Sequence, residues 1–385
     1  MDFSLTPEQQ ALCDAAARFA RQRLQPYYQQ REQEPHLDPA LLKEMGDLGL
    51  IGVDLPEEYG GLGADGVTTG LLIEKIAYGD FNVSYVQLMG SLLGSIVSRN
   101  ASSEVAGAWV PRLIAGEILL AGGLTEPRGG SDAGNMALKA ERVGDGYVLN
   151  GEKTSITFSD QAAAMVVFAR TGKPEDAARG ISAFLVPLDQ KGVSRTHFTD
   201  LGTKIIGRGQ VFFDSVRVPA DHLIGPEGKG FVQVMQGFDF SRVLIGLQCL
   251  AAAQASLDEA WEYSTERKAF GVPLAQYQGV TFPLAEADTQ LTAARWLCYR
   301  ALWLRDRGLP HTAEAAMCKW WAPKLAYEVI HQCLLTHGHY GYTTDLPHQQ
   351  RMRDVLGLQI GDGTAQIMKL IIARERVGKV AVQYA

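Results

Sequence analysis

The stretch IGDGTAQI, residues 360–367, places a single carboxylate, Asp362, between two glycines just before an apolar helical segment. Glycine has no Cβ, so a ligand or another backbone can approach such a position closely. A carboxylate that meets a ligand away from water is suited to accept a proton as a general base. The same pattern is also typical of a turn that opens a helix, so the assignment depends on the other motifs of the chain.

Five further segments carry hydroxyl, cationic or aromatic side chains, which are residue types suited to binding a ligand. They are LTEPRGGSD (124–132), NGEKTSIT (150–157), FDFSR (238–242), RKAFGVPLAQYQGV (267–280) and HGHYGY (337–342). GLGADG, residues 61–66, matches G-x-G-x-x-G, but it follows a helix end and a Pro-broken loop rather than a strand, so we interpret it as a helix–helix connection. The sequence has no G-x-S-x-G, H-E-x-x-H or Walker pattern.

Composition narrows the class of protein. The 385 residues carry 43 acidic and 36 basic side chains, and a net charge of −7 argues against nucleic acid or an anionic membrane as partner. No secretory signal is recognisable at MDFSLTPEQQ, and no uncharged apolar run reaches about 18 residues. The five scattered cysteines form no C-x-x-C, which predicts reduced thiols packed in the core, no metal site and a cytoplasmic protein.

Periodicity predicts three domains, in the order helical, β, helical. The fold class is α+β, mainly α, with a helical domain over residues 1–119, a β domain over 120–228 and a helical bundle over 229–385. Thr6 and Asp38 are placed as N-caps of the first helices, each followed by proline. The pairs Asp145-Gly146 and Asn150-Gly151 predict hairpin turns, and the absence of long helices between the strands predicts an antiparallel sheet.

Together these motifs resemble the acyl-CoA dehydrogenase family of flavoproteins, and the resemblance spans the whole chain, including LPEEYGGLG near its start. It implies an N-terminal helical domain, a middle β domain and a C-terminal four-helix bundle, which agrees with the order predicted from periodicity. It also implies FAD as cofactor, because protein side chains cannot accept a hydride.

The resemblance assigns two sets of residues to FAD. Those that would line the flavin are Leu124, Thr125, Gly130, Ser131, Ile156, Thr157, Thr364 and Gln366; those that would contact its pyrophosphate and adenosine across a subunit interface are Arg267, Phe270, Gln278, Leu335, Gly338 and His339. Three positions depart from the family pattern. Ser155 stands where tryptophan is common, Leu335 where glutamine is common and His339 where glycine is common.

Asp362 stands where most relatives have the glutamate that takes the α-proton, and Gly361 stands where they have tyrosine. Ser241 occupies the second base position known in the family and cannot accept the proton. Substrate contacts are expected from Ser131, Phe238, Asp239, Arg242, Gly363 and Met89.

A shorter acid with no bulk beside it favours a wide acyl group, and the closest resemblance is to the alicyclic branch, the cyclohexane-1-carboxyl-CoA dehydrogenases. Residues 81–102 contain no Asp or Glu, which argues against the 1,4-elimination of some relatives. The resemblance also implies a homotetramer that passes electrons to an electron-transfer flavoprotein. Two alternatives stay open: a nitroalkane-type flavin oxidase and an enzyme for acyl-carrier-protein thioesters.

Overall fold

The computed structural model describes residues 3–381, and its N-terminal part consists of helices around a buried apolar core. The predicted N-cap Thr6 is confirmed and forms a capping box with Gln9: Gln9 N donates to Thr6 Oγ1 at 3.2 Å, and Thr6 N donates to Gln9 Oε1 at 3.1 Å. Asp38 likewise caps its helix by accepting from Ala40 N at 2.9 Å. The helices are α1 (Pro7–Phe19), α2 (Tyr28–Arg31), α3 (Pro39–Asp47), α4 (Gly66–Gly79), α5 (Ser84–Asn100) and α6 (Ser103–Ile114).

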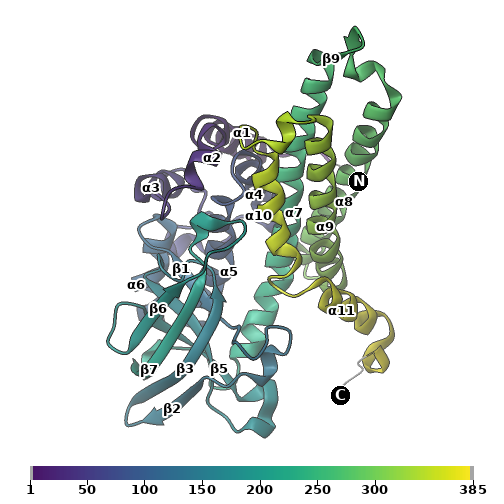
Figure 1. Cartoon of the computed structure of the whole chain (residues 1–385). Helices are drawn as coiled ribbons and strands as arrows, with labels where there is room; N and C mark the ends of the chain where they lie inside the picture. Colours follow the sequence, from purple (N-terminus) through teal and green to yellow (C-terminus); the bar gives the residue numbers. More distant parts are fainter. Residues whose placement is uncertain (1–2, 382–385) are drawn as a thin grey trace.

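The middle of the chain forms one sheet beside the helices (Figure 1). Its strands are β1 (Leu120–Gly123), β2 (Lys139–Val143), β3 (Gly146–Ile156), β4 (Ala164–Arg170), β5 (Ile181–Pro187), β6 (Val193–His197), β7 (Gly209–Pro219) and β8 (Leu223–Ile224). The order is β6-β7-β3-β2-β4-β5-β8, with β1 on β4. A purely antiparallel sheet was the wrong prediction: β1 runs parallel to β4, because the chain reaches the sheet from α6 rather than through a hairpin.

The two predicted hairpin turns have different outcomes. The first lies one residue earlier than predicted, at Gly144 and Asp145, where Gly144 supplies the positive φ of 64°. The second prediction was wrong, because β3 continues through Asn150 and Gly151 with a bulge and no turn. Asn150 Oδ1 instead accepts from the backbone N of Ser215 at 2.8 Å, on the neighbouring strand β7.

Long helices form the C-terminal part. They are α7 (Gly230–Glu266), α8 (Gln278–Asp306), α9 (Thr312–Thr336), α10 (His348–Leu356) and α11 (Ala365–Val377). The short strands β9 (Lys268–Ala269) and β10 (Val272–Pro273) form a hairpin that projects beyond the bundle (Figure 1). By length and composition α7 could cross a membrane, but 94% of its most apolar stretch is buried inside the protein, as in the core helix of a bundle.

One buried carboxylate joins the three parts of the fold. Asp354, on α10, accepts hydrogen bonds from the Tyr28 hydroxyl and the Asn82 side-chain amide of the helical part at 2.5 and 2.9 Å. It also accepts from the backbone N of Thr203, in the β part, at 2.5 Å. These bonds fix how the bundle meets the sheet. The five cysteines are free and buried, as predicted.

Candidate active site

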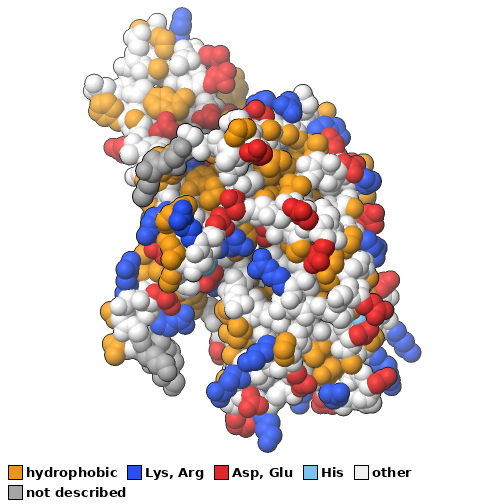
Figure 2. Space-filling model, turned by 180° about the vertical axis from the view of Figure 1, so that it is seen from behind, with side chains coloured by type: hydrophobic (Ala, Val, Ile, Leu, Met, Phe, Trp, Pro, Cys, Tyr) orange, Lys and Arg blue, Asp and Glu red, His pale blue; other side chains and the backbone are white. Residues whose placement is uncertain are grey.

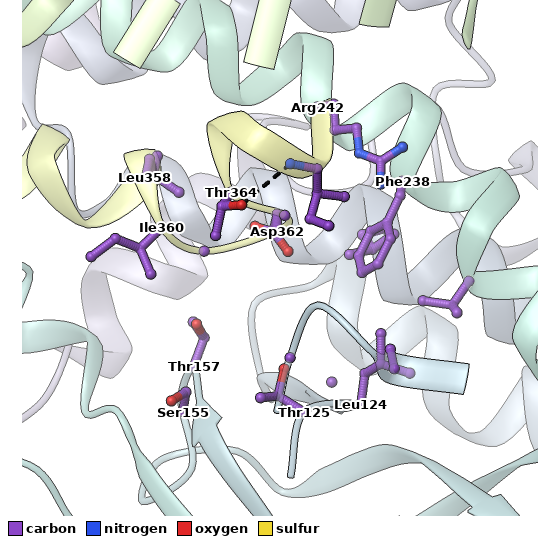
Figure 3. Close-up of a pocket in the computed structure, with 18 of the residues that line it drawn as sticks. Leu124, Thr125, Ser155, Thr157, Phe238, Arg242, Leu358, Ile360, Asp362 and Thr364 are labelled. Carbon is purple, nitrogen blue, oxygen red and sulfur yellow. Dashed lines mark hydrogen bonds between the residues drawn. The ribbon is translucent and has the colours of Figure 1, made fainter. Parts of the chain in front are cut away.

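A cavity of about 1160 Å³ opens where the sheet, α5, α7 and the loop before α11 meet (Figure 3). Predicted site residues from all three parts of the fold line it. They are Met89 on α5, Leu124, Thr125, Gly130, Ser131, Ile156 and Thr157 in the β part, and Phe238, Asp239, Arg242, Asp362, Gly363 and Thr364 in the helical part. The structure therefore brings together residues that are up to about 270 positions apart in the chain.

The loop that carries Asp362 has a tightly defined backbone. The backbone N atoms of Ile360 and Gly361 both donate to the carbonyl of Gly357, at 3.1 and 3.0 Å. Asp362 then takes a φ of 55°, in the left-handed region that non-glycine residues other than Asn and Asp rarely adopt. Thr364 caps α11 by accepting from Ile367 N at 3.3 Å, as Figure 3 shows.

Space is open beside this acid. A Cβ built on Gly361 would have only the carbonyl oxygen of Gly357 within 4 Å, at 3.7 Å. Gly363 differs, because a Cβ there would lie 2.5 Å from the terminal carbon of Met368. In Figure 3 Asp362 lies on one side of the cavity, while Thr125, Ser155 and Thr157 lie on the other.

The opposite wall is built by the turn after β1 and the end of β3. Ser155 has a φ of 58°, which marks a sharp irregularity next to Thr157. A buried ion pair supports the wall: Lys153 Nζ lies 2.9 Å from Glu126 Oε1 and 3.1 Å from the carbonyl oxygen of Leu124. Burial lowers the pKa of Lys153 to about 8, and contact with Lys153 and two backbone N–H groups holds the pKa of Glu126 below its usual value.

On α7, Arg242 is held in place but retains bonding capacity. Its Nη1 donates to Asp239 Oδ1 at 3.1 Å, and Asp239 also accepts from the Thr312 hydroxyl at 2.6 Å. The guanidinium carbon lies 5.4 Å from the centre of the Phe238 ring. Arg242 Nε is buried without a partner among the described residues. Such an unpaired Nε–H donor at a cavity wall can donate a hydrogen bond to an anionic or carbonyl group of a ligand.

Ser241 is buried and donates to the carbonyl of Phe238 at 3.4 Å, so it belongs to the helix rather than to the cavity lining.

The second FAD set does not reach this cavity. The lining of the cavity does not include its members Arg267, Phe270, Gln278, Leu335, Gly338 and His339, and it does not include Gln366. The first six lie where α7 and α9 end and α8 begins; there Tyr263, near the end of α7, stacks on His337 at 4.4 Å. Phe270 is 98% exposed and Leu335 is 56% exposed. Within one chain, therefore, the two predicted sets of FAD-binding residues lie at separate places.

Sequence reasoning missed the buried cations that hold the loops of the cavity. Besides Lys153, the Nζ of Lys319 on α9 donates to the carbonyls of Leu358 and Gly363, at 2.7 and 2.9 Å. The signal was present: each lysine stands in a segment that is otherwise apolar or strand-like, AAMCKWWA for Lys319, where a charge must find buried partners.

Family models match almost the entire chain. The N-terminal, C-terminal and middle domains of acyl-CoA dehydrogenase match residues 6–117, 228–376 and 121–216. A probable acyl-CoA dehydrogenase of Bacillus subtilis is 36% identical, over 97% of this chain and 99% of the relative.

Two solved structures are similar along their whole length. Butyryl-CoA dehydrogenase of Megasphaera elsdenii has a TM-score of 0.94 and 32% identity, over 98% of this chain and 100% of that one. A chain from work on the electron transferring flavoprotein of Acidaminococcus fermentans has a TM-score of 0.94 and 34% identity, with the same coverage.

The chain belongs to the acyl-CoA dehydrogenase family. The predicted fold class, enzyme class and cofactor are confirmed: the protein is an acyl-CoA dehydrogenase, an oxidoreductase that uses FAD.

The residues present fit a flavin. The hydroxyl-bearing residues Thr125, Ser131 and Thr157 and the apolar residues Leu124 and Ile156 line the same cavity. That mixture suits a ring system with polar edges and apolar faces. These residues would hold the cofactor, and it would supply the acceptor for a hydride.

Proposed function

We propose that Asp362 is the base that removes the α-proton of an acyl-CoA bound in the cavity. The observation that carries this is the position of its carboxylate, which faces Thr125 and Thr157 across the cavity. The substrate loses two hydrogens, the α-hydrogen as a proton to Asp362 and the β-hydrogen as a hydride, and an α,β-enoyl thioester results. FAD, when bound, accepts the hydride. Ser241 has no carboxylate, and Asp239 is engaged by Arg242 and Thr312.

The proposed substrate is cyclohexane-1-carboxyl-CoA or a similar alicyclic or branched acyl-CoA. Aspartate is one methylene shorter than glutamate, and the space beside Gly361 is open, so a thick group attached at the α-carbon can approach the acid. Met89, on α5, lines the same cavity and would border the acyl group. The named relative of Megasphaera elsdenii is a butyryl-CoA dehydrogenase, so a short straight chain is the competing substrate.

The residues that we propose to hold the CoA thioester are Arg242, Phe238, Asp239, Ser131 and Gly363. The unpartnered Nε of Arg242 supplies a charged donor, and its contact with the Phe238 ring fixes the guanidinium plane. An acyl-carrier-protein thioester is the alternative, and dependence of affinity on the adenosine phosphate of CoA would distinguish the two.

We also propose a homotetramer in which the second FAD set of one protomer contacts the cofactor of another. Exposed Phe270 and Leu335 belong to that set, and Figure 2 shows hydrophobic side chains on the projecting end of the bundle. Such side chains are typical of an interface. An electron-transfer flavoprotein is the proposed electron acceptor, supported by the similarity to the Acidaminococcus fermentans chain, and the proposed location is the cytoplasm.

The test is anaerobic titration of the holoenzyme with cyclohexanecarboxyl-CoA, butyryl-CoA and octanoyl-CoA, with flavin bleaching as readout. We expect cyclohexanecarboxyl-CoA to bleach fastest, and a faster butyryl-CoA or octanoyl-CoA reaction would reject the alicyclic assignment. Asp362→Asn should bind the ligand and not bleach, whereas bleaching by this variant would reject the base assignment. Rapid reoxidation in air with turnover of nitroalkanes would instead indicate an oxidase, which the small side chain of Ser155 would permit.

A further inference from the structure

A buried ammonium group lies beneath the loop that carries the proposed base. The Lys319 side chain extends from α9, is 1% exposed, and donates to the carbonyls of Leu358 and Gly363 at 2.7 and 2.9 Å. These two carbonyls lie on either side of residues 359–362. One side chain therefore bridges both ends of the short segment that includes Asp362.

This segment needs support from outside. Asp362 has a φ of 55°, in the left-handed region, which aspartate adopts more readily than most non-glycine residues but which is still less stable than the right-handed region for an L-residue. Among the described residues, the backbone hydrogen bonds that hold this segment are those that Ile360 and Gly361 donate to Gly357, and both precede the acid. The bond from Lys319 to Gly363 fixes the chain after it.

The charge of the ammonium group matters as well as its geometry. Burial lowers the pKa of Lys319 to about 8, while the negative charge of Asp362 acts in the opposite direction. The guanidinium of Arg242 opposes the ammonium form. Among the described residues the Lys319 ammonium donates to two backbone carbonyls and not to the Asp362 carboxylate, so the lysine acts on the acid through the backbone and through its electric field.

We propose that Lys319 is a positioning residue for the reaction: it locks the backbone on both sides of Asp362 and so aims the carboxylate into the cavity. The inference depends on the proposed role of Asp362 as base. Lys319 itself does not line the cavity, so its loss should affect the proton-transfer rate far more than ligand affinity.

Three variants of the holoenzyme test this inference. Lys319→Met keeps most of the volume and removes both donors, Lys319→Gln keeps an uncharged N–H donor, and Lys324→Met removes an exposed lysine of the same helix as a matched control. The readouts are the limiting rate of anaerobic flavin bleaching by cyclohexanecarboxyl-CoA, its dependence on pH, and the Kd for an enoyl-CoA product.

We expect the limiting rate of Lys319→Met to fall by about tenfold to a hundredfold, with the Kd for the enoyl-CoA changed by less than about threefold. Lys319→Gln should recover part of the rate, because its side-chain amide keeps an N–H donor for a loop carbonyl. Lys324→Met should match the wild type. A folded Lys319→Met enzyme that bleaches at the wild-type rate would overturn the inference.

A measurement on the wild type covers the case in which the lysine variants do not fold. The amides of Ile360 and Gly361, which donate to the carbonyl of Gly357, should exchange slowly, and exchange as fast as in an exposed turn would also overturn the inference. The base assignment is tested separately by Asp362→Asn. If that variant fails to bleach while Lys319→Met reacts normally, only the positioning inference is wrong.

Discussion

The buried ion pair between Lys153 and Glu126 predicts that removing one partner will strongly lower the free energy of unfolding. The Lys153 side chain is fully buried and Glu126 is 5% exposed, so Lys153→Met leaves a carboxylate without its cationic partner. Breaking such a buried pair on one side costs about 3–5 kcal/mol. Glu126 keeps two donors, the backbone N atoms of Ala137 at 2.6 Å and Leu138 at 2.9 Å, so we expect the lower end, about 3 kcal/mol.

Urea unfolding of the holoenzyme, followed by far-UV circular dichroism, measures this loss, and flavin absorbance after gel filtration measures FAD retention. Lys153→Met should lose FAD as well as stability, because Lys153 also holds the carbonyl of Leu124 at the cavity wall. The double variant Glu126→Gln/Lys153→Met should recover at least half of the lost stability, since no buried charge remains. Lys191→Met, at an exposed position, is the control.

The pH dependence gives a second check. Because the pKa of Glu126 lies below its usual value, the pair contributes stability above about pH 4.5 that is lost as the pH falls through the folded-state pKa. Lys153→Met should lack this contribution. A loss below about 1 kcal/mol at pH 7, or a double variant less stable than the single one, would refute the reasoning.

Three other predictions concern different parts of the molecule. Burial raises the pKa of Asp80 from 3.8 to about 6, so its contribution to stability is present below pH 3.8 and lost as the pH rises through 6. Between pH 4 and pH 7 the free energy of unfolding of the wild type, measured in urea, should fall by about 2–3 kcal/mol relative to that of Asp80→Asn. A difference that stays constant with pH would contradict this. Gly361→Tyr should fold, because space is open beside this residue. It should slow flavin bleaching by cyclohexanecarboxyl-CoA at least about tenfold, while the bleaching rate with butyryl-CoA changes less than about threefold. Equal losses would show that the space beside Asp362 does not select the substrate. Phe270→Asp should reduce the oligomer to smaller species in sedimentation velocity, whereas Val143→Asp, also exposed, should not; an unchanged oligomer would exclude the projecting hairpin from the interface.

Local sequence signals predicted much of the fold because the physics that sets them is local. The capping box of α1, the Asp38 cap of α3 and the proline at the start of each helix fix where these helices begin. The Asn150-Gly151 pair failed for the opposite reason: a bond from Ser215 on the neighbouring strand makes a bulge more favourable than a turn. That partner is 65 residues away, so no short window contains the information.

The candidate site shows the same division. The structure brings Asp362, Thr125, Thr157 and Arg242, which short motifs assigned to the site, to the lining of one cavity. The groups that hold these segments were not predicted. Lys319 acts on carbonyls 39 and 44 residues away, and its partners are backbone atoms that every residue type possesses.

Helix α7 spans 37 residues, about 55 Å, and bears on both halves of the proposed cofactor arrangement. Near its start it presents Phe238 and Arg242 to the cavity, and just past its end stand Arg267 and Phe270 at the projecting hairpin. Because a helix is stiff along its axis, a small tilt at the hairpin displaces the Arg242 guanidinium at the other end. We expect filling of the cavity and the proposed contact between protomers to be thermodynamically linked, so that each changes the affinity of the other by the same factor.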